Sequence, residues 1–178
     1  ELAMAIGRAA ATVLAYGRRR RPLVVMGKDT RISSDMLGAA LAAGLCSVGA
    51  DVIDLGVIST PAVAYLVGKY KADAGVMISA SHNPYAFNGI KIFNGDGFKL
   101  PDELEEQIEH LIEKNDFTYA KGENLGQISH CTTAARDYIE HLKSTIPYSL
   151  EGMNIVVDCA DGSASATART LFEELGAN

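Results

Sequence analysis

Short apolar runs alternate along the chain with longer segments in which apolar residues repeat about every 3.6 positions. The short runs are typical of buried strands and cover residues 23–26, 51–55, 74–78 and 154–158. Residues 89–93 alternate apolar and polar side chains, as a further strand does. The periodic segments predict helices over residues 2–16, 34–48, 60–70, 100–112, 132–144 and 163–175. This alternation predicts an α/β fold with parallel crossovers.

Turn and cap signals separate these elements. Ser33 or Ser34 can cap the helix that follows the first strand, and residues 94–97 (Asn-Gly-Asp-Gly) have the spacing of a hairpin turn. The hairpin signal adds an antiparallel edge, so we expect a mixed, mainly parallel sheet flanked by helices. Residues 115–129 are polar and without a period, which indicates a loop or linker.

The first and last units of the chain resemble each other. Residues 24–29 lead through a helix to Gly49-Ala50-Asp51, and residues 156–158 lead through a helix to Gly176-Ala177-Asn178. The second unit stops where its next strand is due. We therefore predict a first domain over residues 1–148 and the incomplete start of a second, similar domain over residues 149–178.

The composition of the chain narrows the classes of partner that it could bind. The chain has 178 residues, of which 48% are hydrophobic, and 16 Lys+Arg against 22 Asp+Glu leave a net charge of −6. Such a chain lacks the basic face of a nucleic-acid binder, and we interpret the basic run 18–21 as a helix end. No run approaches the ~20 apolar residues of a membrane span. Three widely spaced cysteines (Cys46, Cys131 and Cys159) predict reduced thiols, without a metal, in the cytoplasm.

The most informative polar segment is Ser81-His82-Asn83-Pro84. It follows the buried strand 74–78, and α/β folds place ligand sites at the carboxyl ends of such strands. The hydroxyl of Ser81 has the chemistry of a nucleophile, and the side chains of His82 and Asn83 can orient an oxyanion or a phosphate. The alternative is a polar turn held by local side-chain hydrogen bonds.

Three cations are candidates for the same crevice. Lys28 and Arg31 lie in the loop after the first strand, and arginine suits a phosphate because its planar fork binds two oxygens. Lys91 lies on the polar face of its strand, from which it could donate or accept a proton. The alternatives are an ion pair of Arg31 with Asp29 or Asp35, and a solvent-facing Lys91.

Taken together, these residues resemble the α-D-phosphohexomutase family. The segments that match are Gly27-Lys28-Asp29-Thr30-Arg31, Thr60-Pro61, residues 79–84 and Asn88-Gly89-Ile90-Lys91, in the order and spacing of the family. The match extends over nearly the whole chain. Within the family, residues 78–84 and 156–160 favour the branch that acts on glucosamine phosphates.

The resemblance implies a phosphosugar mutase. The family carries a phosphate on the serine that matches Ser81, donates it to a hexose monophosphate, and takes the other phosphate back from the bisphosphate intermediate. For the glucosamine branch, this interconverts glucosamine 6-phosphate and glucosamine 1-phosphate on the route to UDP-N-acetylglucosamine and the cell wall. A Mg²⁺ ion would contact the phosphate on Ser81, and a sugar bisphosphate would act as activator.

The resemblance also implies a role for each candidate residue. Arg31 would neutralise the phosphate, and Lys28 and Asn83 would help to bind phosphate or substrate. His82 and Lys91 would serve the sugar hydroxyl by hydrogen bonding or proton transfer. The partner implied is a hexosamine phosphate, with neither nucleic acid nor membrane, and a homodimer remains possible.

Several parts of the family pattern are not in the chain. An N-terminal Thr-Asp-Gly-Ile-Arg segment, the magnesium loop of the second domain, the sugar-selecting loop and the final phosphate loop are missing, and Phe87 replaces the usual Asp. We therefore expect the 178 residues alone to show negligible mutase turnover, because three of the four parts that surround the substrate are absent.

Three alternative functions stay open from the sequence. One is a phosphomannomutase or phosphoglucomutase of the same family, because the sugar-selecting loop lies outside the chain. Another is a non-catalytic phosphate-binding module. The third is a serine hydrolase, although the chain lacks Gly-x-Ser-x-Gly and a histidine adjacent to its serine reaches the hydroxyl poorly.

Overall fold

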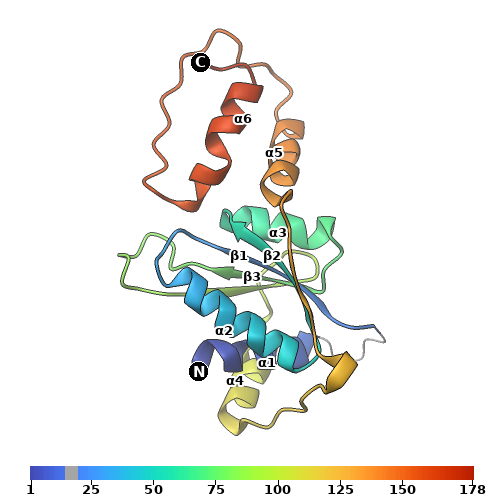
Figure 1. The fold of residues 1–178 in the computed structure, drawn as a ribbon. Helices are drawn as coiled ribbons and strands as arrows, with labels where there is room; N and C mark the ends of the chain where they lie inside the picture. Colours follow the sequence, from blue (N-terminus) through green and yellow to red (C-terminus); the bar gives the residue numbers. More distant parts are fainter. Residues whose placement is uncertain (15–19) are drawn as a thin grey trace.

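The computed structural model describes residues 1–14 and 20–178 and places a five-stranded sheet between two layers of helices (Figure 1). The strands lie in the order β4-β3-β1-β2-β5. Their bounds are β1 Leu23–Lys28, β2 Asp51–Val57, β3 Ala74–Ile78, β4 Ile90–Asn94 and β5 Ile128–His130. All neighbours pair in parallel except β4, which is antiparallel to β3. The expected mixed, mainly parallel sheet flanked by helices is confirmed.

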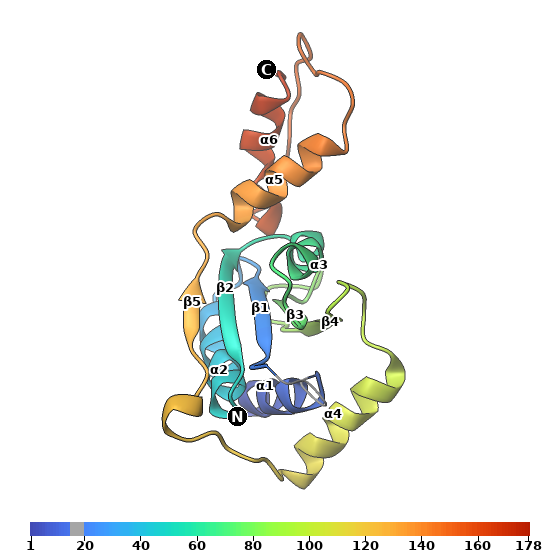
Figure 2. The same cartoon turned by 90° about the vertical axis from the view of Figure 1, so that its right-hand side faces the viewer.

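Helices cover both faces of this sheet. On one face lie α1 (Leu2–Leu14) and α2 (Ser34–Ser47), with α4 (Asp102–Lys114) packed against α1. On the other face lie α3 (Thr60–Lys69) and α5 (Ala134–Ser144), as Figures 1 and 2 show. In β1, Val24 and Met26 face the first layer and Val25 faces the second. Burial on both faces explains why the strand reads as an unbroken apolar run.

Glycines let α1 and α2 pack backbone against backbone. A Cβ added at Gly44 would lie 2.2 Å from the carbonyl oxygen of Met4, and one at Gly7 would lie 2.4 Å from that of Leu41. Neither position has room for a side chain, and the obstacle in both cases is backbone that cannot move alone. The small residues of these two helices therefore set the distance between them.

The antiparallel edge of the sheet is the hairpin of β3 and β4, and its long connection is residues 79–89. At the base of this loop the N–H of Ser79 donates to the carbonyl oxygen of Gly89 at 2.9 Å. A Cβ at Gly89 would lie 2.6 Å from the oxygen of Ser79, so glycine is required there. The turn at residues 94–97, which signalled a hairpin in the sequence, closes only a single bridge between Phe93 and Lys99.

A strand lies in the segment that was expected to be a loop. Residues 115–129 include a short 3₁₀ turn at Gly122–Asn124 and the start of β5, which pairs in parallel with β2. The N–H of Gln127 donates to the carboxylate of Asp51 at 2.9 Å and leads the chain into this pairing. All three residues of β5 are exposed, so the strand has no apolar pattern that a sequence analysis could detect.

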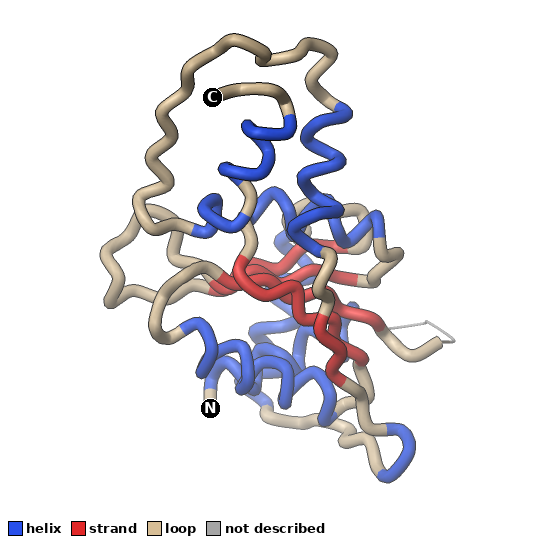
Figure 3. The backbone as a smooth tube through the Cα atoms, turned by 45° about the horizontal axis from the view of Figure 1, so that its top comes forward, coloured by secondary structure: helices blue, strands red, loops and turns tan. Residues whose placement is uncertain are grey.

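The expected strand at residues 154–158 is wrong, because these residues form no strand in the structure (Figure 3). Val156 is fully exposed. A strand needs a partner to satisfy its backbone, and none of the described strands lies beside this segment. The helix expected at residues 163–175 appears as a 3₁₀ turn (Ser163–Ala166) followed by α6 (Ala168–Glu174).

Two sets of contacts connect the C-terminal segment to the rest of the chain. Glu174 of α6 forms ion pairs with Arg136 and Lys143 of α5, the second at 2.8 Å. The hydroxyl of Thr30, in the loop after β1, donates to the carbonyl oxygen of Asp161 at 2.6 Å. The division of the chain into domains at residue 148 stays a prediction.

The basic run at residues 18–21 falls partly outside the described residues, as do the last two residues of the helix expected over 2–16. Arg20 pairs with Asp73 at 2.7 Å, and Arg21 pairs with Asp51 at 3.2 Å. Both arginines therefore bind carboxylates at the amino ends of strands. No described helix is long and apolar enough to cross a membrane.

The contact between α1 and α2 predicts a large cost for Gly44→Ala. The added methyl group meets the backbone of Met4, and we expect a loss of about 1–3 kcal/mol in the free energy of unfolding. Gly68→Ala in α3 is the matched control, because a Cβ there meets nothing within 4 Å. The control should gain about 0.4–1 kcal/mol. Denaturant unfolding measures both, and equal effects would contradict the packing argument.

Candidate functional site

The candidate site is built on the β3–β4 connection, residues 79–89, which we call the serine loop. Ser81 is exposed and has a φ of 57°, in the left-handed region. Its N–H donates to the Oγ of Ser79 at 3.0 Å. A non-glycine residue in this region costs about 1–3 kcal/mol and persists only where its surroundings hold it. The conformation of Ser81 therefore depends on contacts elsewhere in the loop.

Arg31, from the loop after β1, binds the inner side of the serine loop. Its Nη2 donates to the carbonyl oxygens of Ser81 at 3.0 Å and Asn83 at 2.8 Å. Its Nη1 donates to those of Pro84 at 2.8 Å and Phe87 at 3.1 Å. Four of the five N–H donors of a guanidinium thus bind backbone carbonyls of one loop.

The fifth N–H donor of the Arg31 side chain binds the carboxylate of Asp29. The Nε of Arg31 donates to Oδ2 of Asp29 at 2.9 Å, and the backbone N–H of Arg31 donates to Oδ1 at 3.1 Å. Asp29 is buried, and burial alone would raise its pKa. Hydrogen bonds from the Arg31 backbone, the hydroxyls of Ser34 and Ser79, and the Arg31 side chain outweigh burial, so the pKa of Asp29 is lowered. The carboxylate is therefore ionised opposite the guanidinium.

The two serines at the start of α2 do not cap that helix. Ser34 is buried and donates through Oγ to Asp29 at 2.9 Å, while the hydroxyl of Ser33 bonds to the side chain of Asn88 in the serine loop. The ion pair of Arg31 with Asp29, which the sequence left open as an alternative, is present, whereas Asp35 pairs with Lys28. Sequence analysis missed Ser34 as a part of the site.

The remaining predicted site residues lie at different distances from the loop. Lys91 is on the exposed side of β4, as expected, and its Nζ donates to the carbonyl oxygen of Ser79 at 2.9 Å. His82 is exposed beside Ser81. Lys28 instead pairs with Asp35, at the start of α2, at 2.8 Å. The structure thus brings Arg31 and Lys91 to the serine loop, which itself carries His82 and Asn83, whereas the ammonium of Lys28 binds a side chain outside it.

Comparison with known proteins identifies the family. Residues 1–119, about two thirds of the chain, match the family described as "Phosphoglucomutase/phosphomannomutase, alpha/beta/alpha domain I". The chain belongs to this family. The resemblance inferred from the motifs is therefore confirmed.

Relatives of this chain are longer proteins. The phosphoglucosamine mutase of Thermoanaerobacter sp. (strain X514) is 58% identical over 178 residues, and that of Caldanaerobacter subterraneus subsp. tengcongensis is 57% identical. Each alignment covers 99% of this chain and 40% of the relative. A solved phosphoglucomutase/phosphomannomutase family protein from Burkholderia thailandensis matches with a TM-score of 0.84 at 28% identity, over 99% of this chain and 38% of that one. The chain thus spans about two fifths of the length of the curated relatives it matches.

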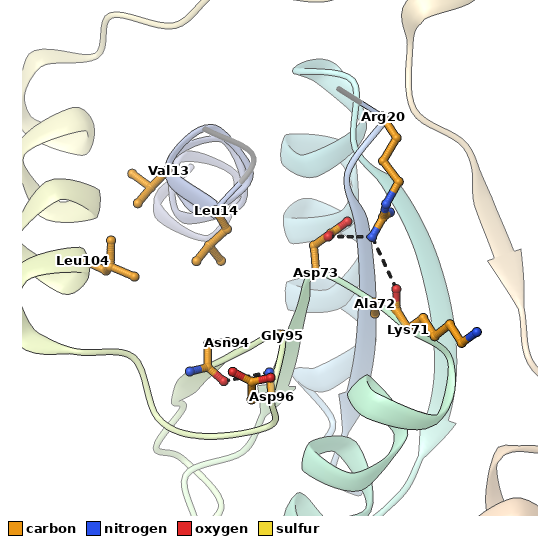
Figure 4. Close-up of a pocket in the computed structure, with 10 residues that line it drawn as sticks. All are labelled: Val13, Leu14, Arg20, Lys71, Ala72, Asp73, Asn94, Gly95, Asp96 and Leu104. Carbon is orange, nitrogen blue, oxygen red and sulfur yellow. Dashed lines mark hydrogen bonds and ion pairs between the residues drawn. The ribbon is translucent and has the colours of Figure 1, made fainter. Parts of the chain in front are cut away.

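A cavity of about 470 Å³ lies at the other end of the sheet (Figure 4). Arg20 reaches across it to Asp73 at 2.7 Å, and Asn94 lines it from the end of β4. Asp73 precedes β3 and Ser79 follows it, so five residues, or about 16 Å of strand, separate the cavity from the serine loop. The cavity is not part of the candidate site.

The ionised carboxylate of Asp29 predicts a pH dependence of stability. The pKa of Asp29 in the folded chain lies below its ordinary 3.8, so the unfolded chain takes up the proton first as the pH falls. The stabilisation is complete above about pH 4 and is lost as the pH drops through the folded-state pKa. Asp29→Asn should cost about 1–3 kcal/mol at pH 7, and its stability should fall less steeply than that of wild type below pH 4.

Unfolding by denaturant at several pH values between 2 and 7 measures this difference. Asp116→Asn is the control, because Asp116 is an exposed carboxylate in the loop after α4. Parallel acid profiles for wild type and Asp29→Asn would show that Asp29 does not carry the effect.

Proposed function

We propose that the full-length protein interconverts glucosamine 6-phosphate and glucosamine 1-phosphate by way of a phosphate on Ser81. The observation that carries this proposal is an exposed serine hydroxyl on a loop whose backbone is bound by a guanidinium on a side chain that is 10% exposed. Phosphoryl transfer depends mainly on positioning and charge neutralisation, which such a loop can supply. The two phosphoglucosamine mutases named above, at 58% and 57% identity, support the choice of sugar.

In the proposed reaction, phosphoryl groups move in two steps. In the first, the bond from phosphorus to Oγ of Ser81 breaks, a bond to a sugar hydroxyl forms, and the hydroxyl proton passes to a base. The product is a sugar bisphosphate. After this intermediate turns over, its other phosphoryl group returns to Oγ of Ser81, so no phosphate is consumed.

His82 and Lys91 would serve the sugar hydroxyl. His82 is exposed next to Ser81 and can accept the proton of the attacking sugar hydroxyl. Lys91 has three donors, one of which is bound to the carbonyl oxygen of Ser79, which leaves it able to donate to a phosphate or a hydroxyl. Lys28 and Asn83 are proposed to assist in binding phosphate or substrate.

A magnesium ion and a sugar bisphosphate activator remain part of the proposal through the family resemblance. The ion would offset charge on the phosphate of Ser81. Residues 1–14 and 20–178 contain no group of three or more His, Cys, Asp or Glu side chains that could hold a metal ion. The other ligands would therefore come from outside the described residues, and no step is assigned to the ion here.

The serine hydrolase alternative has less support from this site. A hydrolase activates its serine through a hydrogen-bonded base. Within the described part of the chain, the recorded side-chain hydrogen bonds place neither a histidine nor a carboxylate on Oγ of Ser81. A phosphomannomutase or phosphoglucomutase activity is kept as an outcome of the assay below.

The proposal predicts that Ser81→Ala abolishes both phosphorylation and mutase activity of the full-length protein. Mass spectrometry of the purified protein should find a phosphate on Ser81 in wild type and none in the variant. Ser144→Ala, at the end of α5, is the control and should keep both. An active enzyme with unmodified Ser81 would contradict the phosphoserine scheme. Faster turnover of glucose or mannose 6-phosphate than of glucosamine 6-phosphate would change the substrate but not the scheme.

A further inference from the structure

We infer that Arg31 is a positioning residue that holds Ser81 in place through the backbone of the serine loop, rather than a ligand of the phosphate. The claim that Arg31 holds the serine loop rests on the contacts of Arg31 alone. Its consequence for catalysis rests on the proposed function.

The first support is the use of every donor on Arg31. A guanidinium has five N–H groups, and in this structure each has a protein acceptor: four loop carbonyls and Asp29. A phosphate oxygen could bind Arg31 only by displacing one of these acceptors. The displaced carbonyl would then lose its partner inside the loop.

The second support is the spacing of the four acceptors. They belong to Ser81, Asn83, Pro84 and Phe87, so seven consecutive residues fold around one cation. Carbonyl oxygens that converge in this way repel one another unless a positive group lies between them. The bond from Nη2 to the carbonyl of Ser81 acts directly on the residue whose φ is 57°. Arg31 therefore stabilises the conformation that presents the Ser81 hydroxyl.

The third support is the brace that fixes Arg31 itself. Its side chain is 10% exposed, and Asp29 binds both its Nε and its backbone N–H. Asp29 in turn accepts from Ser34 and donates its own N–H to the carbonyl oxygen of Ile78, the last residue of β3. The guanidinium is thus anchored on the two parallel strands β1 and β3, and the loop is positioned from them.

The substitution Arg31→Lys separates the effect of charge from that of hydrogen-bond geometry. An ammonium keeps the positive charge but carries its three donors on one atom, so it cannot reach four carbonyls and Asp29 together. If Arg31 positions the loop, Arg31→Lys should damage the site although the charge is retained. If Arg31 only neutralises a phosphate, the same variant should keep much of its function.

Arg21 provides a matched control. It also binds an aspartate, Asp51, and donates to two backbone carbonyls, those of Glu123 and Leu125. These contacts lie at the amino end of β2, away from the serine loop. Arg21→Lys therefore removes a comparable set of hydrogen bonds without touching the site.

The test compares full-length wild type, Arg31→Lys and Arg21→Lys by amide hydrogen exchange and by mutase kinetics. The N–H groups of Ser81, Asn83 and Phe87 are hydrogen-bonded within the loop and report its order. We expect Arg31→Lys to speed exchange in residues 81–88 by about tenfold or more. We expect kcat to fall about 100-fold with KM for the sugar phosphate nearly unchanged, because the nucleophile is misplaced rather than the substrate released. Arg21→Lys should change exchange near residues 123–127 only.

Unchanged exchange in the loop together with a raised KM would make Arg31 a phosphate ligand and overturn the inference. A wild type with neither phosphoserine nor mutase activity would end the proposed function, and the exchange comparison would still decide the role of Arg31. If Arg31→Lys does not fold, Asp29→Asn replaces it. That variant keeps the guanidinium but loses its brace, so it should speed exchange in the same loop, and unchanged exchange would again overturn the inference.

Discussion

The site depends on one largely buried guanidinium, that of Arg31, which is shared between two loops. Parallel pairing of β1 and β3 sets Lys28 opposite Ile78, so the residues that follow these strands leave the sheet side by side. Arg31 then lies within reach of the serine loop, and its four bonds to backbone carbonyls bind a segment that has no strand or helix of its own. Ser81 can be exposed and still ordered because the loop is held from its inner side.

The partial burial of this guanidinium is tolerated because its hydrogen bonds are complete. A buried ion pair gains little stability after its desolvation, and removal of one partner leaves an uncompensated charge. Asp29 and the loop carbonyls supply an acceptor for each donor of Arg31, and among the described residues no buried side-chain nitrogen or oxygen lacks a partner. The value of the arrangement therefore lies in orientation more than in stability. This is what a reaction limited by positioning requires.

Strand pairing explains the two places where the pattern of residues and the observed elements differ. Residues 154–158 have the apolar run of a buried strand but no partner among the described strands, and they are extended chain without a ladder. β5 has no apolar pattern, yet it is a strand because it pairs with the edge of β2. Asp51 also binds the backbone that leads into β5. In both cases the neighbour, not the local sequence, decides whether hydrogen bonds can form.

Local sequence was sufficient for the order of the helices and of β1 to β4, for the mixed sheet, for the loop that carries Ser81 and for the family to which the chain belongs, but not for β5 or for residues 154–158. Periodicity, turn residues and motif spacing are properties of neighbouring positions, so they can be recognised in the sequence alone. Only the tertiary structure decided where the donors of Arg31 go, that Ser34 binds Asp29 instead of capping α2, and that Lys28 pairs with Asp35. These partners are set by how β1, β3 and α2 pack together in space. A side chain with several donors can satisfy them in many ways, and the fold selects one of them.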